Sequence, residues 1–328
     1  MTESLKDSTV LVTGGAGLIG SHIVDELLKE NVAQVRVMDN LVRGRKENLA
    51  DALTDRRVRF IEADVRNRTA VLDAMRNCDY VFHQAAIRIT LCAEQPRECM
   101  EVLVNGAFNV FESAVQCKVK KIVYASSASV YGAAEEFPTN ENHHPYCNRT
   151  LYGAAKLMNE GIARSFHDMY GLPSVGLRYF NVYGPRMDVT GAYTEVLIRW
   201  LDCIDRGEAP QIHGDGSTSM DFVYVADIAR ANLLAIKSDR GDDVYNVGSG
   251  EETTLIELWQ AMQRAAGGSV CDPICVPARN TNPVPRRLAD TQRAKRDIGF
   301  MAATSIEDGL RELVAWRGEQ LRRWKQTA

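Results

Sequence analysis

A glycine-rich turn between an apolar run and an amphipathic segment constrains the fold of this chain most. Ser8–Thr13 (STVLVT) is apolar and β-branched, which is typical of a strand, and the segment from Ser21 onward has the pattern of an amphipathic helix. Between them, Gly14 permits a tight turn, Gly17 lets a pyrophosphate approach the helix N-terminus, and Gly20 lets helix and strand pack closely. A plain glycine turn is the alternative. Strand, turn and helix in this order predict a dinucleotide-binding unit.

The acidic residue that selects the dinucleotide follows the second predicted strand. Gln34–Met38 ends in Asp39, close to the expected spacing of about twenty residues from the glycine turn. Its carboxylate can accept hydrogen bonds from the adenosine ribose hydroxyls, and it would repel a 2′-phosphate. Arg43, Arg45 and Lys46 come next and would suit NADP, but Asp39 occupies the selecting position. We therefore expect NAD as the cofactor.

Strands and helices alternate along the first half of the chain. Strands are predicted at Val58–Ile61, Tyr80–His83 and Lys121–Ala125, and helices at Ala70–Asn77 and Pro96–Cys117. This order predicts an α/β fold with a Rossmann-type, doubly wound parallel sheet, in which ligands bind beyond the carboxyl ends of the strands. The residues expected to form the cofactor site there are Gly14, Gly17, Leu18, Ile19, Asp39, Asn40, Asp64, Val65, Ala85 and Ala86.

The second half of the chain continues the alternation without a break. Strands are predicted at Val175–Tyr179 and Val244–Val247, with a helix at Ala226–Lys237 between them. No internal repeat, low-complexity tract or long linker separates the parts. We expect an NAD-binding domain at residues 1–180 and a smaller C-terminal α/β substrate lobe at 181–328, with some segments of the second half returning to the first domain.

Composition excludes several classes of protein. A net charge of -4 over 328 residues gives no signal for binding a polyanion, so we expect no nucleic-acid partner. No apolar run approaches the length of a membrane span, and Met1–Ser8 is too polar for a secretory signal, so we expect a cytoplasmic protein without a membrane partner. Among the eight cysteines only Cys271 and Cys275 lie close together, and no further ligands complete a zinc pattern. We expect no metal site.

A phenol and an ammonium lie four residues apart in the stretch TLYGAAK. On a helix, Tyr152 and Lys156 share one face. A free phenol has a pKa of about 10, so Tyr152 is a poor base at neutral pH unless a nearby cation such as Lys156 favours the phenolate. A Tyr-x-x-x-Lys pair also arises by chance, but here it accompanies the glycine turn and the serine cluster Ser126–Ser129. The combination indicates proton abstraction from an alcohol.

Taken together, the motifs resemble the NAD-dependent epimerase/dehydratase family, the extended short-chain dehydrogenase/reductases, and most closely their nucleotide-sugar 4-epimerases. The matching stretches cover nearly the whole chain. They are VTGGAGLIGSH, HQAA, SSASVYG, TLYGAAK, RYFNVYGPR, GDGSTSMDFVYVADIA, YNVGSG and ADTQRAKRDIGF.

The resemblance implies roles for individual residues. Tyr152 would be the base and acid, Lys156 its activator and a ligand of the nicotinamide ribose, and Ser127 the hydroxyl that bonds the reacting oxygen. Arg88 falls where relatives often place a basic residue near the cofactor. Asn105 is either a structural or a cofactor-side polar residue. The substrate site implied by the resemblance comprises Ser127, Ser129, Tyr152, Asn181, Arg186, Arg279 and Arg287.

Two departures from the family pattern bear on the substrate. Met220 and Asn280 stand where relatives usually carry arginines that hold the diphosphate. Guanidinium groups elsewhere could substitute, because they pair well with phosphate. Arg287 falls where related epimerases carry a residue that lines the sugar pocket, and three interpretations stay open: it holds the diphosphate, it binds an anionic sugar such as a uronic acid, or it points to solvent. The arginines that could substitute are Arg186, Arg279, Arg286 and Arg287.

The family contains several reactions, and the residues favour one of them. Ser127-Ala128-Ser129 stands where 4,6-dehydratases usually carry Thr-Asp-Glu, so the acid and base for eliminating water are missing. The resemblance therefore favours an NAD-dependent 4-epimerase acting on a nucleotide sugar, with UDP as the expected nucleotide, through a transient 4-keto sugar. A decarboxylase or reductase of the family and a non-catalytic NAD(H)- or nucleotide-sugar-binding protein are the alternatives. The resemblance also implies a homodimer formed by Pro96–Cys117 and Leu151–Tyr170.

Overall fold

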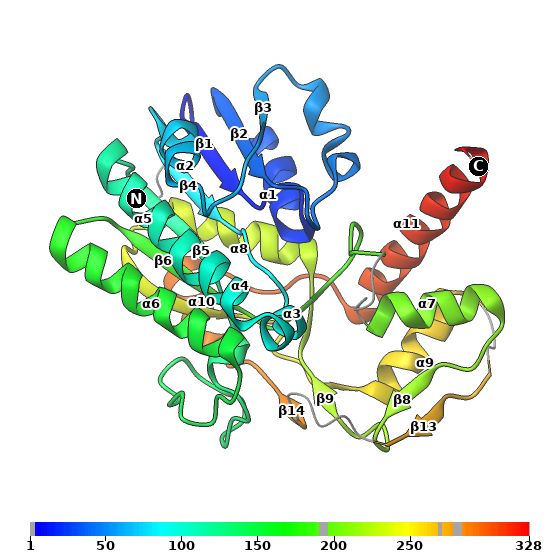
Figure 1. The fold of residues 1–328 in the computed structure, drawn as a ribbon. Coiled ribbons are helices and arrows are strands. Elements are labelled where there is room, and N and C mark those ends of the chain that lie inside the picture. The colour runs from blue at the N-terminus through cyan, green and yellow to red at the C-terminus, as the bar shows by residue number, and fades with distance from the viewer. Residues whose placement is uncertain (1–3, 190–195, 268–270, 278–283, 328) are drawn as a thin grey trace.

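Seven parallel strands form the main sheet of the protein (Figure 1). The structure is a computed structural model that describes residues 4–189, 196–267, 271–277 and 284–327, with side chains as far as residue 322. In chain order the sheet strands are β1 (Thr9–Thr13), β2 (Gln34–Asp39), β3 (Val58–Glu62), β4 (Tyr80–His83), β5 (Lys121–Ser127), β6 (Ser174–Tyr179) and β11 (Asp242–Val247).

The order of the strands across the sheet is β11-β6-β5-β4-β1-β2-β3. From β1 the chain builds outward through β2 to β3, and it then returns to place β4 on the other side of β1. This reversal leaves a crevice beyond the carboxyl ends of β1 and β4, where doubly wound sheets bind their ligands. The prediction of a Rossmann-type parallel sheet is confirmed.

Helices cover both faces of the sheet, as Figure 1 shows. One face carries α1 (Leu18–Lys29), α8 (Val225–Lys237) and α10 (Gln292–Ile298), and the other carries α2 (Arg68–Met75), α5 (Gly106–Cys117) and α6 (Leu151–Tyr170). Val10 and Val12 of β1 pack with Ile23 of α1, whereas Leu11 packs with Val110 of α5 on the opposite face. Strands buried on both faces read as continuous apolar runs for this reason.

The predicted helix Pro96–Cys117 is helical throughout, but it is not one regular α-helix. It consists of α4 (Pro96–Cys99), a π-helical stretch at Met100–Asn105 and then α5, and the short helix α3 (Ile89–Glu94) precedes it. The exposed Asn105 side chain donates a hydrogen bond to Glu101 Oε2 at 2.8 Å within the π-helical stretch. This contact supports the structural interpretation of Asn105 over the cofactor-side one.

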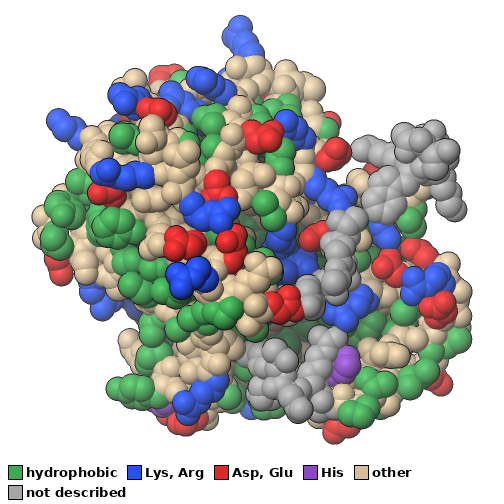
Figure 2. Space-filling model, in the orientation of Figure 1, with side chains coloured by type: hydrophobic (Ala, Val, Ile, Leu, Met, Phe, Trp, Pro, Cys, Tyr) green, Lys and Arg blue, Asp and Glu red, His purple; other side chains and the backbone are tan. Residues whose placement is uncertain are grey.

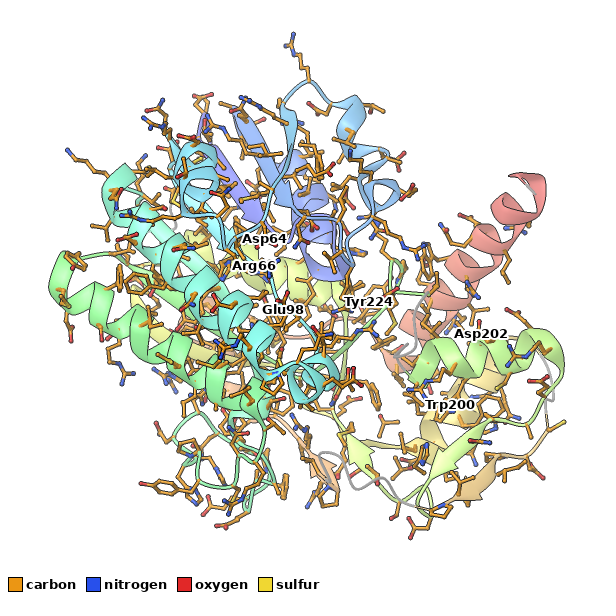
Figure 3. All side chains as sticks on the ribbon, in the orientation of Figure 1. Asp64, Arg66, Glu98, Trp200, Asp202 and Tyr224 are labelled. Carbon is orange, nitrogen blue, oxygen red and sulfur yellow. The ribbon has the colours of Figure 1, made fainter. Side chains whose placement is uncertain are left out.

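A smaller lobe lies at the carboxyl end of the sheet. Its core includes Trp200, labelled in Figure 3, and Trp259, and the two rings meet edge to face with centroids 5.6 Å apart. Arg317 donates a hydrogen bond to Asp202 at 2.7 Å and joins the last helix to α7. The lobe is built from α7 (Val196–Arg206), β8 (Gln211–His213), β9 (Ser219–Met220), β12 (Thr253–Thr254), α9 (Leu255–Ala265), β13 (Ile274–Val276), β14 (Arg286–Arg287) and α11 (Ile306–Thr327).

Two short strands connect the lobe to the main sheet. They are β7 (Asn181–Tyr183) and β10 (Phe222–Tyr224), which pair in parallel. The segments α8, β11 and α10 lie between lobe segments in the sequence, yet they pack on the main sheet. The division at residue 180, with later segments returning, stays a prediction.

Basic and acidic side chains are interspersed on the face shown in Figure 2. Within the described ranges, none of the helices has the length and apolar character to cross a membrane. The same part of the chain contains no group of three or more His, Cys, Asp or Glu side chains arranged for a metal ion. All eight cysteines are free thiols.

Candidate active site

A cleft of about 1910 Å³ opens at the carboxyl ends of the sheet strands and extends to the lobe. Lys156 and Arg287 lie beside its wall rather than in it, and Arg279 falls outside the described residues. All the other predicted site residues line the cleft. These are Gly14, Gly17, Leu18, Ile19, Asp39, Asn40, Asp64, Val65, Ala85, Ala86, Arg88, Ser127, Ser129, Tyr152, Asn181 and Arg186.

The glycine turn fits a dinucleotide because side chains would fill the space that the turn leaves open. Gly14 has a φ of +66°, and a Cβ there would lie 2.6 Å from the Ala85 nitrogen. A Cβ at Gly20 would lie 2.3 Å from the Gly14 oxygen, so this glycine is needed for the helix to approach the strand. Gly17 precedes α1 in an extended conformation and leaves the first helical N–H groups facing the cleft.

The Asp39 carboxylate is fixed at the end of β2 by two backbone donors. Its oxygens accept hydrogen bonds from Ala16 N–H at 3.0 Å and Leu41 N–H at 2.8 Å, while burial raises its pKa. A Cβ at Gly44 would lie 2.6 Å from Asp39 Oδ1, so the following loop passes directly over the carboxylate. The group is therefore oriented before any ligand arrives.

The Asp64 carboxylate is held by neighbours at the end of β3 (Figure 3). It accepts hydrogen bonds from Asn40 and Arg66, both at 2.7 Å, and Arg66 also pairs with Glu98 at 2.9 Å. The hydrogen bond from Arg66 lowers the Asp64 pKa to about 2. This network joins the loop after β2, which bears Asn40, to the loop after β3, which bears Val65.

Tyr152 and Lys156 lie on α6 at the spacing that predicted one shared face, and Ser127, which the resemblance implied, lies beside the phenol. Thr150 accepts a hydrogen bond from Gly153 N–H at 3.1 Å, so α6 begins at Leu151 and Tyr152 lies in its first turn. The Lys156 ammonium donates to the Ala125 carbonyl at 2.7 Å and lies 5.7 Å from the centroid of the Tyr152 ring. Ser127 hydrogen-bonds the phenol of Tyr152. Phenol, hydroxyl and ammonium thus meet at the end of β5.

Burial, more than any neighbouring cation, sets the protonation of these groups. Burial raises the Tyr152 pKa to about 12, although the Ser127 hydrogen bond and the charges of Arg43 and Arg287 oppose this. Burial also lowers the Lys156 pKa to about 8. The sequence predicts that Lys156 favours the phenolate of Tyr152. In the protein without ligands, burial has the larger effect on the Tyr152 pKa.

A buried ion pair anchors α6 to the sheet. Glu160 lies one helical turn beyond Lys156 and pairs with Arg178 of β6 at 2.6 Å, with side chains 9% and 8% exposed. Ser126 donates a hydrogen bond to the same carboxylate at 2.5 Å, and Arg178 donates to the Tyr131 hydroxyl at 2.8 Å. The register of Tyr152 and Lys156 against β5 depends on these contacts.

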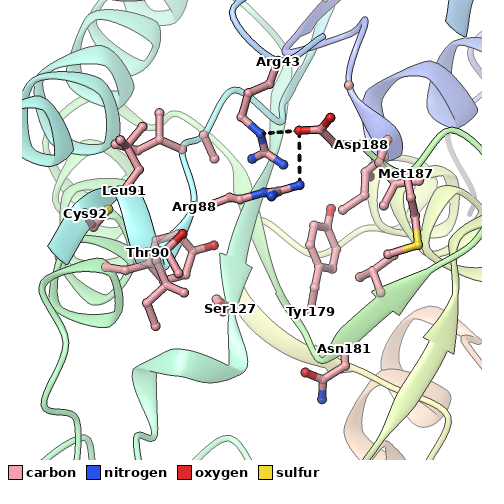
Figure 4. Close-up of a pocket in the computed structure, with 18 of the residues that line it drawn as sticks. Arg43, Arg88, Thr90, Leu91, Cys92, Ser127, Tyr179, Asn181, Met187 and Asp188 are labelled. Carbon is pink, nitrogen blue, oxygen red and sulfur yellow. Dashed lines mark hydrogen bonds and ion pairs between the residues drawn. The ribbon is translucent and has the colours of Figure 1, made fainter. Parts of the chain in front are cut away.

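Arg88 faces the cleft with a partner that sequence reasoning missed (Figure 4). Asp188 accepts a hydrogen bond from Arg88 at 3.3 Å and pairs with Arg43 at 3.6 Å. The three side chains come from loops after β4, β2 and β7, so the contact joins both halves of the cleft. Asp188 lies two residues after Arg186, which ends the motif RYFNVYGPR. Nothing in the motif predicts that Asp188 pairs with Arg88.

The predicted substrate residues differ in how they are held. Asn181 lines the cleft and donates to the Asp221 carbonyl at 3.2 Å. Arg186 has a φ of +70° and pairs with Asp25 of α1 at 2.7 Å, which directs it toward the cofactor side. Met220 lines the cleft, whereas Asn280 is outside the described residues.

Thr90, Cys92 and Arg199 are among the residues that line the cleft without having been predicted. Thr90 and Cys92 come from α3, whose existence the sequence did not reveal, and Figure 4 shows both at the cleft. Arg199 comes from α7 in the lobe. The Thr90 hydroxyl is buried and has no hydrogen-bond partner in the described part of the chain. Thr90 and Cys92 could have been predicted only from a motif spanning residues 88–92.

Comparison with known proteins identifies the family of this chain. A family model described as the NAD-dependent epimerase/dehydratase family matches residues 10–248. The chain belongs to this family. A putative UDP-glucose 4-epimerase of Methanocaldococcus jannaschii is 34% identical over 315 residues, covering 94% of this chain and 97% of that protein.

Solved structures of family members share the fold of the whole chain. The UDP-N-acetylglucosamine 4-epimerase of Methanobrevibacter ruminantium, solved with UDP-N-acetylmuramic acid, has a TM-score of 0.90 and 34% identity, covering 96% of this chain and 99% of that one. The UDP-glucose 4-epimerase of Bifidobacterium longum, solved with NAD+ and UDP, has a TM-score of 0.87 and 27% identity, with coverage of 96% and 99%. The cofactor of this family is NAD, as Asp39 predicted.

Family members also catalyse other reactions. A UDP-N-acetyl-alpha-D-glucosaminuronate decarboxylase of Bacillus cytotoxicus is 29% identical over 316 residues, covering 93% of this chain and 96% of that protein. The chain therefore belongs to a family of NAD-dependent enzymes that act on sugar nucleotides. The reaction is inferred from the residues of the cleft.

Proposed function

We propose that the protein is an NAD-dependent 4-epimerase of a UDP-sugar. The observation that carries the proposal is the meeting of Tyr152, Ser127 and Lys156 at the end of the NAD cleft. Ala128 and Ser129 supply no carboxylate beside them, which disfavours elimination of water. The 4-epimerase relatives share this fold over nearly the full chain.

Each residue of the catalytic group has its own role in the proposed reaction. NAD, which the glycine turn and Asp39 would hold, would supply the acceptor and donor of the C4 hydride. The Tyr152 phenolate takes the proton of the C4 hydroxyl, and Ser127 donates a hydrogen bond to the same oxygen. Lys156 holds positive charge beside the phenol and offers a donor to the nicotinamide ribose. Once the 4-keto sugar has turned its other face to the cofactor side, Tyr152 would return the proton to the C4 oxygen.

NMR of sugar nucleotides incubated in D2O tests the proposed reaction. We expect the C4 epimer to appear with ordinary hydrogen at C4, because the hydride returns without exchange with solvent. A transient absorbance near 340 nm should accompany turnover. A lasting absorbance would instead show net oxidation, and a pentose product would show a decarboxylase. Binding without any product would support the non-catalytic alternative.

We also propose a homodimer formed by α5 and α6. Phe108 and Phe166 of these helices meet edge to face at 5.6 Å, and the surface around them exposes apolar side chains. Met169 is 67% exposed and Tyr170 54% exposed, which is unusual for a patch that faces only water. Light scattering should give twice the chain mass, and Met169→Glu should give the monomer. A monomeric parent at micromolar concentration would contradict the proposal.

A further inference from the structure

Asp188 joins two loops of the cofactor half of the cleft to the segment after β7. Its Oδ2 atom accepts a hydrogen bond from Arg88 at 3.3 Å and lies 3.6 Å from Arg43 Nε (Figure 4). Arg43 belongs to the loop after β2, and Arg88 follows β4 as the residue before α3. The side chains of Arg88 and Asp188 are 14% and 16% exposed, so water and salt screen this pair less than an ion pair on the open surface.

The loop that bears Arg43 is fixed to the glycine turn on both sides of Arg43. Before it, the Asp39 carboxylate accepts a hydrogen bond from Ala16 N–H at 3.0 Å. After it, the Arg45 N–H and the Asn48 side chain both donate to the Ala16 carbonyl, at 3.0 and 2.8 Å. Arg43 therefore cannot move away from the cleft unless these contacts or its contact with Asp188 break.

The segment that bears Asp188 is fixed to α1. Arg186 pairs with Asp25 of α1 at 2.7 Å, and α1 begins at Leu18, directly after the glycine turn. The Arg43–Asp188 contact thus closes a ring that consists of the glycine turn, the loop after β2, the segment after β7 and the first turns of α1. This ring surrounds the N-terminus of α1, where the pyrophosphate of a dinucleotide binds.

We propose that Asp188 closes this ring over bound NAD, so that its contacts must break before the cofactor enters or leaves. A carboxylate would repel a phosphate, so Asp188 acts through the two guanidinium groups and is a positioning residue. The inference rests on the NAD cofactor of the family and is independent of the reaction proposed above. Retention suits that reaction, because an epimerase ends each turnover with its cofactor in the initial oxidation state.

Exchange of the cofactor in the absence of any sugar tests the inference. Protein loaded with NADH is mixed with excess NAD+, and the loss of bound NADH fluorescence gives the dissociation rate. Mixing NADH with cofactor-free protein gives the association rate. Asp188→Asn should raise both rates about tenfold, the effect of one charged hydrogen bond. The Kd should stay nearly unchanged, because the same contacts break for entry and for exit.

Three further variants separate a closed ring from a local effect of Asp188. Asp25→Asn opens the ring at its other tie and should also raise both rates, although Asp25 does not line the cleft. Asp188→Glu keeps the charge and should restore part of the slow exchange. Asp73→Asn is the matched control, since it removes only an exposed ion pair with Arg76 on α2 and should leave both rates unchanged.

Three results would overturn the inference. Unchanged exchange in Asp188→Asn would show that the ring does not restrict the cofactor. Faster dissociation with unchanged association would show that Asp188 orients the arginines toward the phosphates of bound NAD. Slower dissociation would show that Asp188 competes with these phosphates. Failure of the proposed function looks different, because a protein that epimerises no sugar can still show restricted exchange, and an active epimerase with unchanged exchange in Asp188→Asn refutes only the ring.

Discussion

The cofactor half and the lobe half of the cleft are built in different ways. In the cofactor half, Asp39, Lys156 and Glu160 are each oriented by hydrogen bonds to protein groups. In the sugar half, Arg287 comes from a two-residue strand and lacks an acidic partner in the described part of the chain. The contacts of Asp39, Lys156 and Glu160 preorganise the NAD side of the cleft. We therefore expect substitutions in the first half to affect the chemistry and the cofactor, and substitutions in the second half to affect the choice of sugar.

The largest effect is expected at the point where the two halves meet. Tyr152→Phe should lower turnover by about a thousandfold or more, because it removes the proton carrier and little else. NAD binding and the melting temperature should be unchanged, as checked by cofactor content and calorimetry. Tyr146→Phe is the control, since Tyr146 is 80% exposed and should keep full activity. Retention of a tenth of the activity by Tyr152→Phe would remove Tyr152 from the role.

The preorganised half is expected to be sensitive to loss of its buried ion pair. Glu160→Gln leaves the Arg178 guanidinium buried without its carboxylate, so the free energy of unfolding should fall by about 3 kcal/mol. Denaturant unfolding measures this. Glu112→Gln removes an ion pair of the more exposed Arg68 and should cost less than about 1 kcal/mol. Equal losses in the two variants would show that burial does not set the contribution of the Glu160–Arg178 pair to stability.

Cofactor choice should respond to the oriented carboxylate of β2. Asp39→Ala removes the acceptor for the ribose hydroxyls and the repulsion of a 2′-phosphate, so the affinity for NAD should fall about tenfold and the preference over NADP should shrink. Titration calorimetry with both dinucleotides measures these changes. Glu62→Ala, at the exposed end of β3, should leave both affinities unchanged. An Asp39 variant that still strongly prefers NAD would show that other contacts select the cofactor.

The smallest effect is electrostatic and crosses from the lobe to the catalytic phenol. The positive charge of Arg287 lowers the Tyr152 pKa, so Arg287→Met should raise it. The phenolate is the active form, and therefore the rising limb of kcat against pH should move to higher pH, by less than about one unit. Saturating UDP-glucose serves as the substrate. A limb that stays in place, or that also moves in Arg286→Met, would show that Arg287 does not act on Tyr152.

Short-range patterns in the sequence determined much of this protein. The glycines that shape the turn, the Asp39 that ends β2 and the Tyr152–Lys156 spacing were all predictable. Each rests on contacts between residues close in the chain, where strand or helix geometry fixes the distance. The parallel sheet was predictable because each strand is followed by a helix, and this alternation can be seen in the local pattern of the sequence.

Tertiary structure alone decided which distant residues complete the cleft. Asp188 meets Arg88 from 100 residues away, and Ser126 meets Glu160 across the interface between β5 and α6. No periodicity links such positions, so no local pattern predicts them. The protonation of Tyr152 is a further case. The sequence showed the nearby cation, but only the fold reveals the burial that outweighs it and raises the Tyr152 pKa.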